Sequence, residues 1–201
     1  MVYDGGPSDN ELFRRAVLAA VIGNFFDFGV MGLEVPISLF DETFRQHFSR
    51  GLDIDDTPKM LDMLDNVVYV ADNCGEILLD TLVFDIIKEL GGHVTLVVRG
   101  EPILTDVTMK DVIELGIDGK VDRVLTTGSG SIGVDMEQAP QELLNAFRDA
   151  SLIISKGMAN YETLTEHEIG PIAYLLKAKC KPVARHIGVD VGHSVARLFE
   201  Q

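Results

Sequence analysis

Asp72 and Asn73 directly follow a run of five apolar-rich residues, 67–71, and precede a helical pattern that carries Glu76 and Asp80. If the run is a buried parallel strand, both side chains lie at the carboxyl edge of the sheet, where open α/β sheets bind ligands. A carboxylate beside an amide suits a Mg²⁺-like cation, which prefers oxygen donors and keeps some of its waters. The alternative is that one of the two side chains caps the following helix. The dipeptide alone leaves both interpretations open.

Three further loops should share this edge, because parallel strands place their carboxyl ends on one side of a sheet. They are residues 99–106, 128–131 and 156–160. Asp106 is the natural third ligand beside the first two, and its alternative role is to cap the next helix. Thr108 is the better cap for that helix, which favours the ligand interpretation.

The same loops offer groups that suit an anion. Lys156 follows the apolar run 152–154, so we expect its ammonium to emerge at the edge as a point charge for phosphate. A solvated surface lysine is the alternative. Gly128 and Ser129 open a loop that is expected to present backbone N–H groups to phosphate, or to be a flexible turn. The loop lacks the spacing of a P-loop or of a dinucleotide site.

Asn24 and Asp27 lie among phenylalanines between residues 23 and 29. Polar groups in so apolar a segment need partners, and the edge of the sheet is one place to find them. Cys74 is better interpreted as a small thiol at a helix start than as a nucleophile, since no histidine is placed by spacing to serve it. The histidines show no zinc-site spacing, and Cys74 and Cys180 form no CxxC pair.

The pattern along the chain indicates an α/β fold. Continuous apolar strands alternate with amphipathic helices, which is typical of a mostly parallel, doubly wound sheet with helices on both faces. The expected strands are residues 66–72, 93–99, 121–127, 151–156 and 171–179. Helices are expected over residues 8–22, 38–50, 75–90 and 140–150, and from Thr57 and Thr108. We expect one continuous domain, in which a helical N-terminal flank (1–65) packs on an α/β core (66–201).

The 201 residues carry a formal net charge of −15, and 46% of them are hydrophobic. No run of lysine and arginine is present, so nucleic acid is not an expected partner. The apolar stretch 16–36 is interrupted by polar and charged residues, so no membrane helix is expected, and a cytoplasmic protein is the default. Oligomeric state is not indicated by the sequence.

Five segments together resemble the metal-dependent damage-control phosphatases, a former domain of unknown function also described as similar to an acidic-residue (protein-glutamate) methyltransferase. The segments are GNFFDFG, DNCGEILLD, RGEPILTDVT, KGMANYE and KCKPVARHIGV. They occur in the family's order and span roughly residues 16–192. The resemblance implies a divalent metal ion, Mg²⁺ or Mn²⁺ with Co²⁺ or Ni²⁺ as alternatives, held by Asp72, Asn73 and Asp106.

The resemblance also implies that Lys156 and neighbouring backbone amides receive the phosphate of a small phosphorylated metabolite. The expected substrate-binding residues are Asn24, Asp27, Glu76, Arg99, Gly128, Ser129, Gly157 and Asn160, and Glu162 also matches a motif position. Family members usually carry a further helical segment before the point where this sequence begins, often with a CxxC pair. We therefore expect substrate selection or a second metal site to differ here.

The leading functional prediction is hydrolysis of a small phosphomonoester, such as a phosphosugar or a damaged phosphometabolite. Asp72 and Lys156 are the expected catalytic residues, and water is favoured over a carboxylate as nucleophile. A haloacid-dehalogenase-like phosphatase ranks below, because its DxD pair needs an aspartate where Cys74 stands. Two other classes remain: an S-adenosylmethionine-dependent carboxyl methyltransferase, and a non-catalytic module that binds metal and phosphometabolite.

Overall fold

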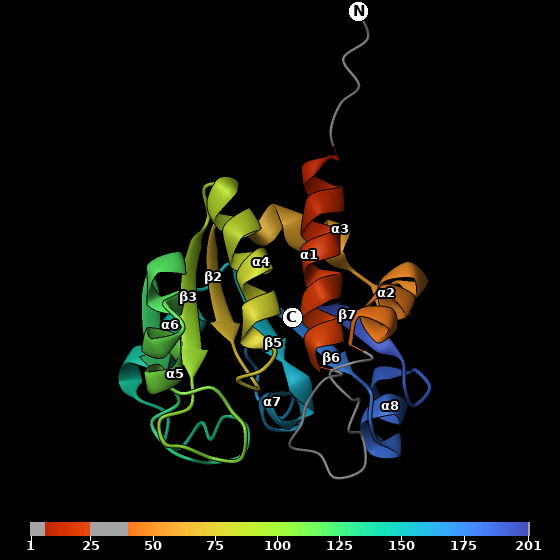
Figure 1. Cartoon of the computed structure of the whole chain (residues 1–201). Coiled ribbons are helices and arrows are strands. Elements are labelled where there is room, and N and C mark those ends of the chain that lie inside the picture. The colour runs from red at the N-terminus through yellow and green to blue at the C-terminus, as the bar shows by residue number, and fades with distance from the viewer. Residues whose placement is uncertain (1–6, 25–39, 201) are drawn as a thin grey trace, which may run out of the picture.

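The computed structural model describes residues 7–24 and 40–200, and its centre is a seven-stranded sheet of order β1-β7-β6-β5-β2-β3-β4 (Figure 1). The strands are β1 (Ile54–Asp55), β2 (Asn66–Val70), β3 (His93–Val98), β4 (Arg123–Thr126), β5 (Leu152–Lys156), β6 (Ile172–Lys177) and β7 (Ser194–Phe199). Neighbouring strands pair in parallel, except that β6 and β7 are antiparallel. The expected α/β fold with a mostly parallel sheet is confirmed.

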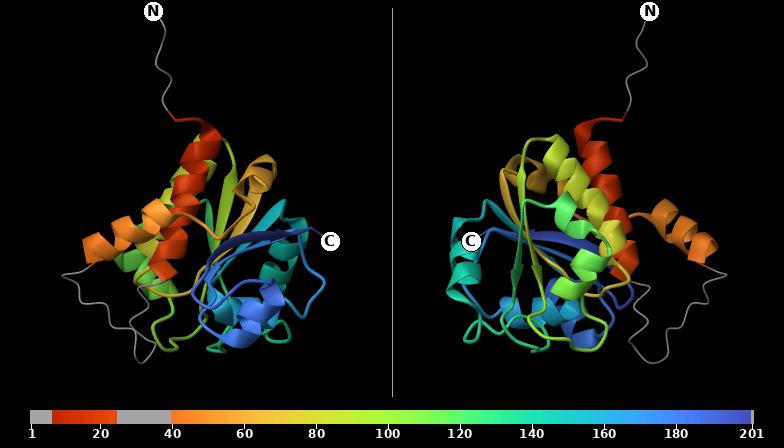
Figure 2. Two further views of the ribbon diagram at one scale, coloured as in Figure 1. Left: turned by 90° about the vertical axis from the view of Figure 1, so that its right-hand side faces the viewer. Right: turned by 60° about the vertical axis from the view of Figure 1, so that its left-hand side comes forward.

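Helices cover both faces of the sheet. The α-helices are α1 (Asp9–Gly23), α2 (Phe40–Arg50), α3 (Thr57–Met60), α4 (Ile77–Glu89), α5 (Met109–Glu114), α6 (Gln141–Asp149), α7 (Gly157–Leu164) and α8 (Lys181–Ile187). Short 3₁₀ helices span Leu61–Met63 and Ile117–Lys120. One hydrophobic core joins α1, α4 and α5 to the sheet, and a second joins α6, α7 and α8 to it. Figure 2 shows α1 and α4 lying side by side over one face.

The central strands are apolar because both of their faces are covered. Every residue of β5 is buried, and so are the last four residues of β2. Side chains alternate between the two faces of a strand, so a strand covered on both sides needs apolar residues at successive positions. This requirement explains why these segments were recognisable as uninterrupted apolar runs.

The strand order reverses between β2 and β5. From β2 the chain proceeds through β3 to β4 on one side, and β5 then returns to the other side of β2 and leads to β6. The carboxyl ends of β2 and β5 therefore flank the crevice where ligands bind in open α/β sheets. Asp72 follows β2 and Gly157 follows β5, so the fold brings both predicted segments to this point.

Several segments differ from the sequence-based expectation. Residues 157–160 were expected to be a loop, but they begin helix α7. Strands β1 and β7 and helix α8 were not predicted. Strand β1 has only two residues, and β7 runs antiparallel, so neither continues the repeating parallel pattern. Strand β1 lies within the segment 1–65 that was expected to be a helical flank.

No helix among residues 7–24 and 40–200 has the length and apolar character needed to cross a membrane.

Candidate active site

The predicted metal ligands Asp72 and Asn73 lie at the carboxyl end of β2 and are 8% and 7% exposed. The loop that carries Asp106 is held against them by backbone hydrogen bonds. Cys74 N–H donates to the carbonyl of Thr105 at 2.8 Å, and Val107 N–H donates to the carbonyl of Asp72 at 2.9 Å. Asn73 and Asp106 form an isolated antiparallel bridge, so the three predicted ligands are neighbours.

Arg99 stands between the two aspartates. Its Nε donates to Asp106 Oδ2 at 2.5 Å, and its Nη2 lies 3.9 Å from Asp72 Oδ1. The guanidinium also donates to the side-chain oxygen of Asn160 and to the carbonyl of Gly133. Arg99 is 2% exposed, so its guanidinium holds these groups in place from within the protein and does not face solvent.

Lys156 is fully buried, and the expectation that its ammonium emerges at the edge of the sheet is wrong. Its Nζ donates to Asp80 Oδ1 at 2.6 Å, to Glu76 Oε2 at 3.0 Å and to the carbonyl of Ala20 at 3.0 Å. Each of its three N–H donors therefore has an acceptor within the protein. Burial would lower its pKa, but the charges of Asp80 and Glu76 outweigh burial and raise it, so the group stays charged.

Glu76 connects this buried cation to the ligand pair. Its Oε1 accepts the backbone N–H of Asn73 at 2.9 Å and the side-chain amide of Asn24 at 3.2 Å. The same Asn24 amide also donates to Asp72 Oδ2 at 3.2 Å. Asn24 is thus brought to the site as predicted, whereas Asp27 lies outside the described residues.

Gly157 lies against Asp72 so closely that no other residue fits. A Cβ atom at this position would lie 1.9 Å from Asp72 Oδ2, and its φ of +75° is one that L side chains rarely adopt. This contact explains the glycine between β5 and α7. It also directs the start of α7 at the Asp72 carboxylate.

The remaining predicted residues separate into two groups. Asn160 is buried, and its side-chain amide donates to the carbonyls of Ala71 and Lys156, so it joins β2, β5 and Arg99. Gly128 and Ser129 do not line either of the two cavities that adjoin Asp72 and Asn73, which are described below. The Ser129 carbonyl instead accepts the N–H of Gly100, which draws this loop toward residue 100. Glu162 is exposed and lines a different cavity, between α7 and α8.

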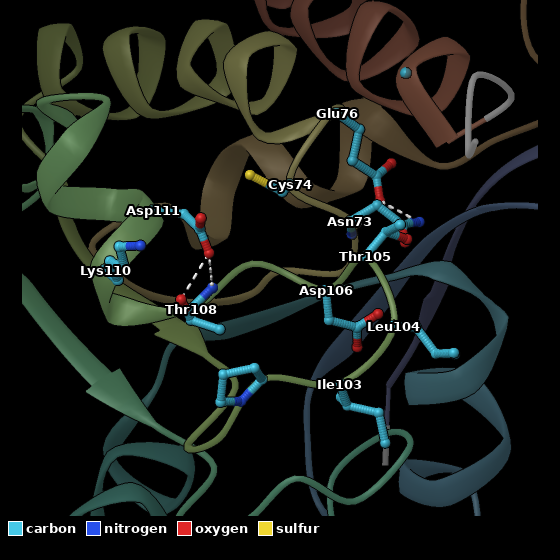
Figure 3. A pocket seen from close by; sticks show the side chains of 13 residues that line it. Asn73, Cys74, Glu76, Ile103, Leu104, Thr105, Asp106, Thr108, Lys110 and Asp111 are labelled. Carbon is cyan, nitrogen blue, oxygen red and sulfur yellow. Dashed lines mark hydrogen bonds between the residues drawn. The ribbon is translucent and has the colours of Figure 1, made fainter. Parts of the chain in front are cut away.

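Two cavities meet at the ligand pair and share the loop Ile103–Asp106. The larger, of about 440 Å³, extends from Asn73 past Cys74 to Lys110 and Asp111 (Figure 3). The smaller, of about 180 Å³, contains Asp72, Asn73 and Asp106 together with Lys179 and the first turn of α7. The second cavity therefore combines the oxygen ligands with groups that favour an anion.

Comparison with known proteins gives the family. Residues 2–195 match the damage-control phosphatase ARMT1-like domain. The chain belongs to this family. A damage-control phosphatase of Archaeoglobus fulgidus is 44% identical over 192 residues, which are 95% of this chain and 67% of that protein. A damage-control phosphatase of Pyrococcus horikoshii is 35% identical over 184 residues, 90% of this chain and 63% of that protein.

A crystal structure of a DUF89 family protein from Pyrococcus horikoshii has the same fold, with a TM-score of 0.83 and 34% sequence identity. The match covers 92% of this chain and 65% of that chain. This chain therefore spans about two thirds of the length of these damage-control phosphatases.

The charge of the site fits the divalent cation that the family resemblance implies. Four carboxylates, Asp72, Glu76, Asp80 and Asp106, are matched by two buried cations, which leaves two negative charges. Burial and the charges of Glu76 and Asp106 raise the pKa of Asp72 to about 8, against the opposing effects of Arg99 and Lys156. The raised pKa means that the Asp72 carboxyl tends to hold a proton because the positive charge around it is insufficient. A bound cation would supply that charge and displace the proton.

The donor set consists of two carboxylates and one amide oxygen, which are the hard ligands that Mg²⁺ and Mn²⁺ accept. Within the described part of the chain, no group of three or more histidine, cysteine, aspartate or glutamate residues is placed to hold a metal ion, so the expected ion would have to use the amide oxygen of Asn73 as well. Its Oδ1 accepts the hydroxyl of Thr105 at 2.9 Å and its side-chain NH₂ donates to Asp72 Oδ2 at 3.2 Å, and together these bonds fix the orientation of the amide. These residues fit the expected ion.

Three site residues were given no role in the sequence analysis. Asp80 is the second acceptor for Lys156, and its spacing of four from Glu76 on a helix was the available signal. Thr105 orients Asn73, and nothing in the sequence distinguishes its hydroxyl from a surface one. Lys179 lies just beyond the carboxyl end of β6 and lines the smaller cavity, a place that the strand pattern indicated.

Proposed function

We propose that this chain hydrolyses small phosphomonoesters with a divalent metal ion, Mg²⁺ or Mn²⁺, held by Asp72, Asn73 and Asp106. One observation carries the proposal: these three side chains share a cavity with Lys179 and the N-terminus of α7. An oxygen-rich cation site next to an anion site is what a phosphoryl group bridging to a metal requires. Membership of a damage-control phosphatase family agrees with this reaction.

The phosphoryl group would lie between the ligand pair and the start of α7. The first N–H groups of a helix have no acceptor within the helix, and its N-terminus carries partial positive charge. Helix α7 begins at Gly157 without a side-chain cap, and Met158 and Ala159 of its first turn line the cavity. Lys179 adds a positive charge beside this turn, since its backbone N–H donates to Met158 Sδ at 3.2 Å and the residue lines the same cavity.

The reaction joins the oxygen of water to phosphorus and breaks the ester P–O bond, which releases an alcohol and inorganic phosphate. A bound divalent ion would polarise a phosphoryl oxygen and offset charge on the phosphoryl group. Arg99 and Lys156 contribute by holding the carboxylates in place, because their donors are occupied by Asp106, Glu76 and Asp80. In this proposal Lys156 is a positioning residue and does not contact phosphate.

A panel of small phosphomonoesters with Mg²⁺, Mn²⁺, Co²⁺ or Ni²⁺ tests the proposal through phosphate release. Asp72→Asn keeps the shape of the side chain but removes its charge, and we expect it to lower turnover at least about 100-fold. Asp118→Asn is the matched control, since Asp118 is an exposed carboxylate outside both cavities. No phosphate release with any metal, or full activity of the Asp72 variant, would refute the assignment.

Titration with S-adenosylmethionine by calorimetry separates the methyltransferase alternative. We expect no heat of binding, because the loop after β2 is rich in oxygen ligands and lacks the glycine-rich sequence that would hold that cofactor. Measurable binding together with no phosphate release would favour the methyltransferase. Metal binding without phosphate release and without S-adenosylmethionine binding would favour the non-catalytic binding module.

A further inference from the structure

The loop between the two cavities carries a leucine in an unusual backbone conformation. Ile103 and Asp106 are joined by a backbone hydrogen bond of 3.0 Å, so residues 103–106 form a tight turn. Leu104 occupies the second position of this turn with φ of +46°, and it is the one described non-glycine residue with positive φ. A turn of this kind normally has glycine there. Backbone strain of this sort, on the order of 1–3 kcal/mol, is concentrated at functional sites.

Leu104 is also exposed. Its side chain is 81% exposed, the highest value among the large hydrophobic residues of the described part of the chain. A strained position that presents an apolar side chain to water has no stabilising effect on the folded protein by itself. An exposed apolar side chain of this kind is explained if an apolar group of a ligand binds against it.

The surroundings of Leu104 are apolar on the side of the smaller cavity. Ile103, Ile132 and Met158 line this cavity with it, and Ile132 is itself 60% exposed. The polar residues that line the cavity are Asp72, Asn73, Thr105, Asp106 and Lys179. The cavity thus combines charged groups, near which a phosphate would bind, with an apolar wall formed by these four apolar side chains. Figure 3 shows Ile103 and Leu104 on the same loop as Asp106.

The loop is tied to the metal ligands, so its apolar side chains have a fixed place relative to them. Cys74 N–H bonds the carbonyl of Thr105, and the Thr105 hydroxyl bonds Asn73 Oδ1. A group held at the ligand pair would therefore place its remaining atoms against the side chains of residues 103 and 104. A substrate covered with hydroxyl groups would leave those hydroxyls without partners on this wall, which is unfavourable.

We propose that the preferred substrates are phosphomonoesters of alcohols with an apolar face, such as short alkyl or aryl phosphates, and that Leu104 determines this specificity. This inference rests on the proposed phosphatase function. It excludes fully hydroxylated sugar phosphates as the best substrates. A buried methylene contributes about 0.8 kcal/mol, so each added methylene that reaches the wall should raise kcat/KM by up to about fourfold.

The test compares propyl phosphate with glycerol 3-phosphate, which have three carbons each and differ by two hydroxyl groups, and then extends the alkyl chain to butyl and pentyl. Leu104→Asn is the informative variant, because asparagine tolerates positive φ and has a similar size but is polar. It should abolish the gain in kcat/KM per methylene across the propyl, butyl and pentyl series. Leu90→Ala is the control, since Leu90 is 42% exposed at the far end of α4.

Calorimetric binding of propyl, butyl and pentyl phosphonate in the presence of Mg²⁺ gives a second readout that does not depend on turnover. Affinity that rises with chain length but without hydrolysis of any ester would support the inference and refute the phosphatase. Hydrolysis or phosphonate binding without dependence on chain length, or a Leu104→Asn variant that keeps the dependence, would overturn the inference alone. If neither esters nor phosphonates bind, both fail.

Discussion

Replacing Lys156 by methionine tests whether the buried cation holds the site together. The side chains of Lys156, Glu76 and Asp80 are between 0% and 1% exposed, so none of the three charges is solvated. Removing one partner of such a buried pair costs about 3–5 kcal/mol, because the charge left behind remains buried without compensation. Lys156→Met leaves two carboxylates in that state, so we expect the free energy of unfolding to fall by at least about 3 kcal/mol.

The loss should depend on pH. Burial and the charge of Glu76 already raise the pKa of Asp80 from 3.8 to about 7, although Lys156 opposes them. Without the lysine this pKa rises further, so Asp80 stays protonated in the folded variant at low pH. An acid whose folded pKa is raised loses stability as pH increases toward that pKa. In the wild type this pH-dependent loss from Asp80 ends near pH 7, so the additional destabilisation of the variant should grow mainly above pH 7, by up to about 1.4 kcal/mol per pH unit.

Urea unfolding in the presence of EDTA measures the change without a contribution from bound metal. The double variant Lys156→Met/Asp80→Asn removes one of the uncompensated charges, and we expect it to be more stable than the single variant at pH 8. Lys120→Met is the control, since Lys120 pairs with Asp85 at the surface, and such pairs contribute at most about 1 kcal/mol. A loss below about 1 kcal/mol for Lys156→Met, or a double variant less stable than the single one, would refute the reasoning.

Three further predictions concern the ligand pair. Gly157→Ala places a Cβ atom 1.9 Å from Asp72 Oδ2, and we expect phosphatase activity to fall at least about 100-fold, measured by phosphate release. Thr105→Val removes the hydroxyl that orients Asn73, and metal affinity measured by calorimetry should fall about 10- to 100-fold, whereas an unchanged affinity would contradict that role. Mn²⁺ at about 100 times its Kd should raise the free energy of unfolding by about 2.7 kcal/mol, and Asp72→Asn should remove most of this gain.

The parallel core of the fold was predictable because it depends on local patterns. Strands β2, β3 and β5 are covered on both faces, so each is an uninterrupted apolar run. Strand β7 lies between β1 and β6, and it pairs in parallel with β1 but antiparallel with β6. Its existence depends on the distant residues 54–55 and 172–177, and a local pattern does not contain that information.

The proximity of Asp72 and Asp106 could be predicted from the sequence, but the contacts of the basic residues could not. Asp72 and Asp106 follow strands, and parallel topology alone brings them to one edge. Lys156 also follows a strand, yet its side chain enters the protein because Glu76 and Asp80 from α4 and a carbonyl from α1 surround it. Whether a lysine at a strand end faces solvent is decided by helices elsewhere in the chain.

Helix α1 is a part of the site and not a cover over it. The N–H of Asn24 bonds the carbonyl of Ile22, which leaves the carbonyl of Ala20 to accept from Lys156. Carbonyl groups in the last turn of a helix carry partial negative charge, so α1 stabilises the ammonium electrostatically as well. Asn24 then donates to both Asp72 and Glu76. A fragment that begins at residue 66 would lack an acceptor for the buried lysine and a donor for two carboxylates, so we expect the segment before the α/β core to be required for assembling the proposed metal ligands.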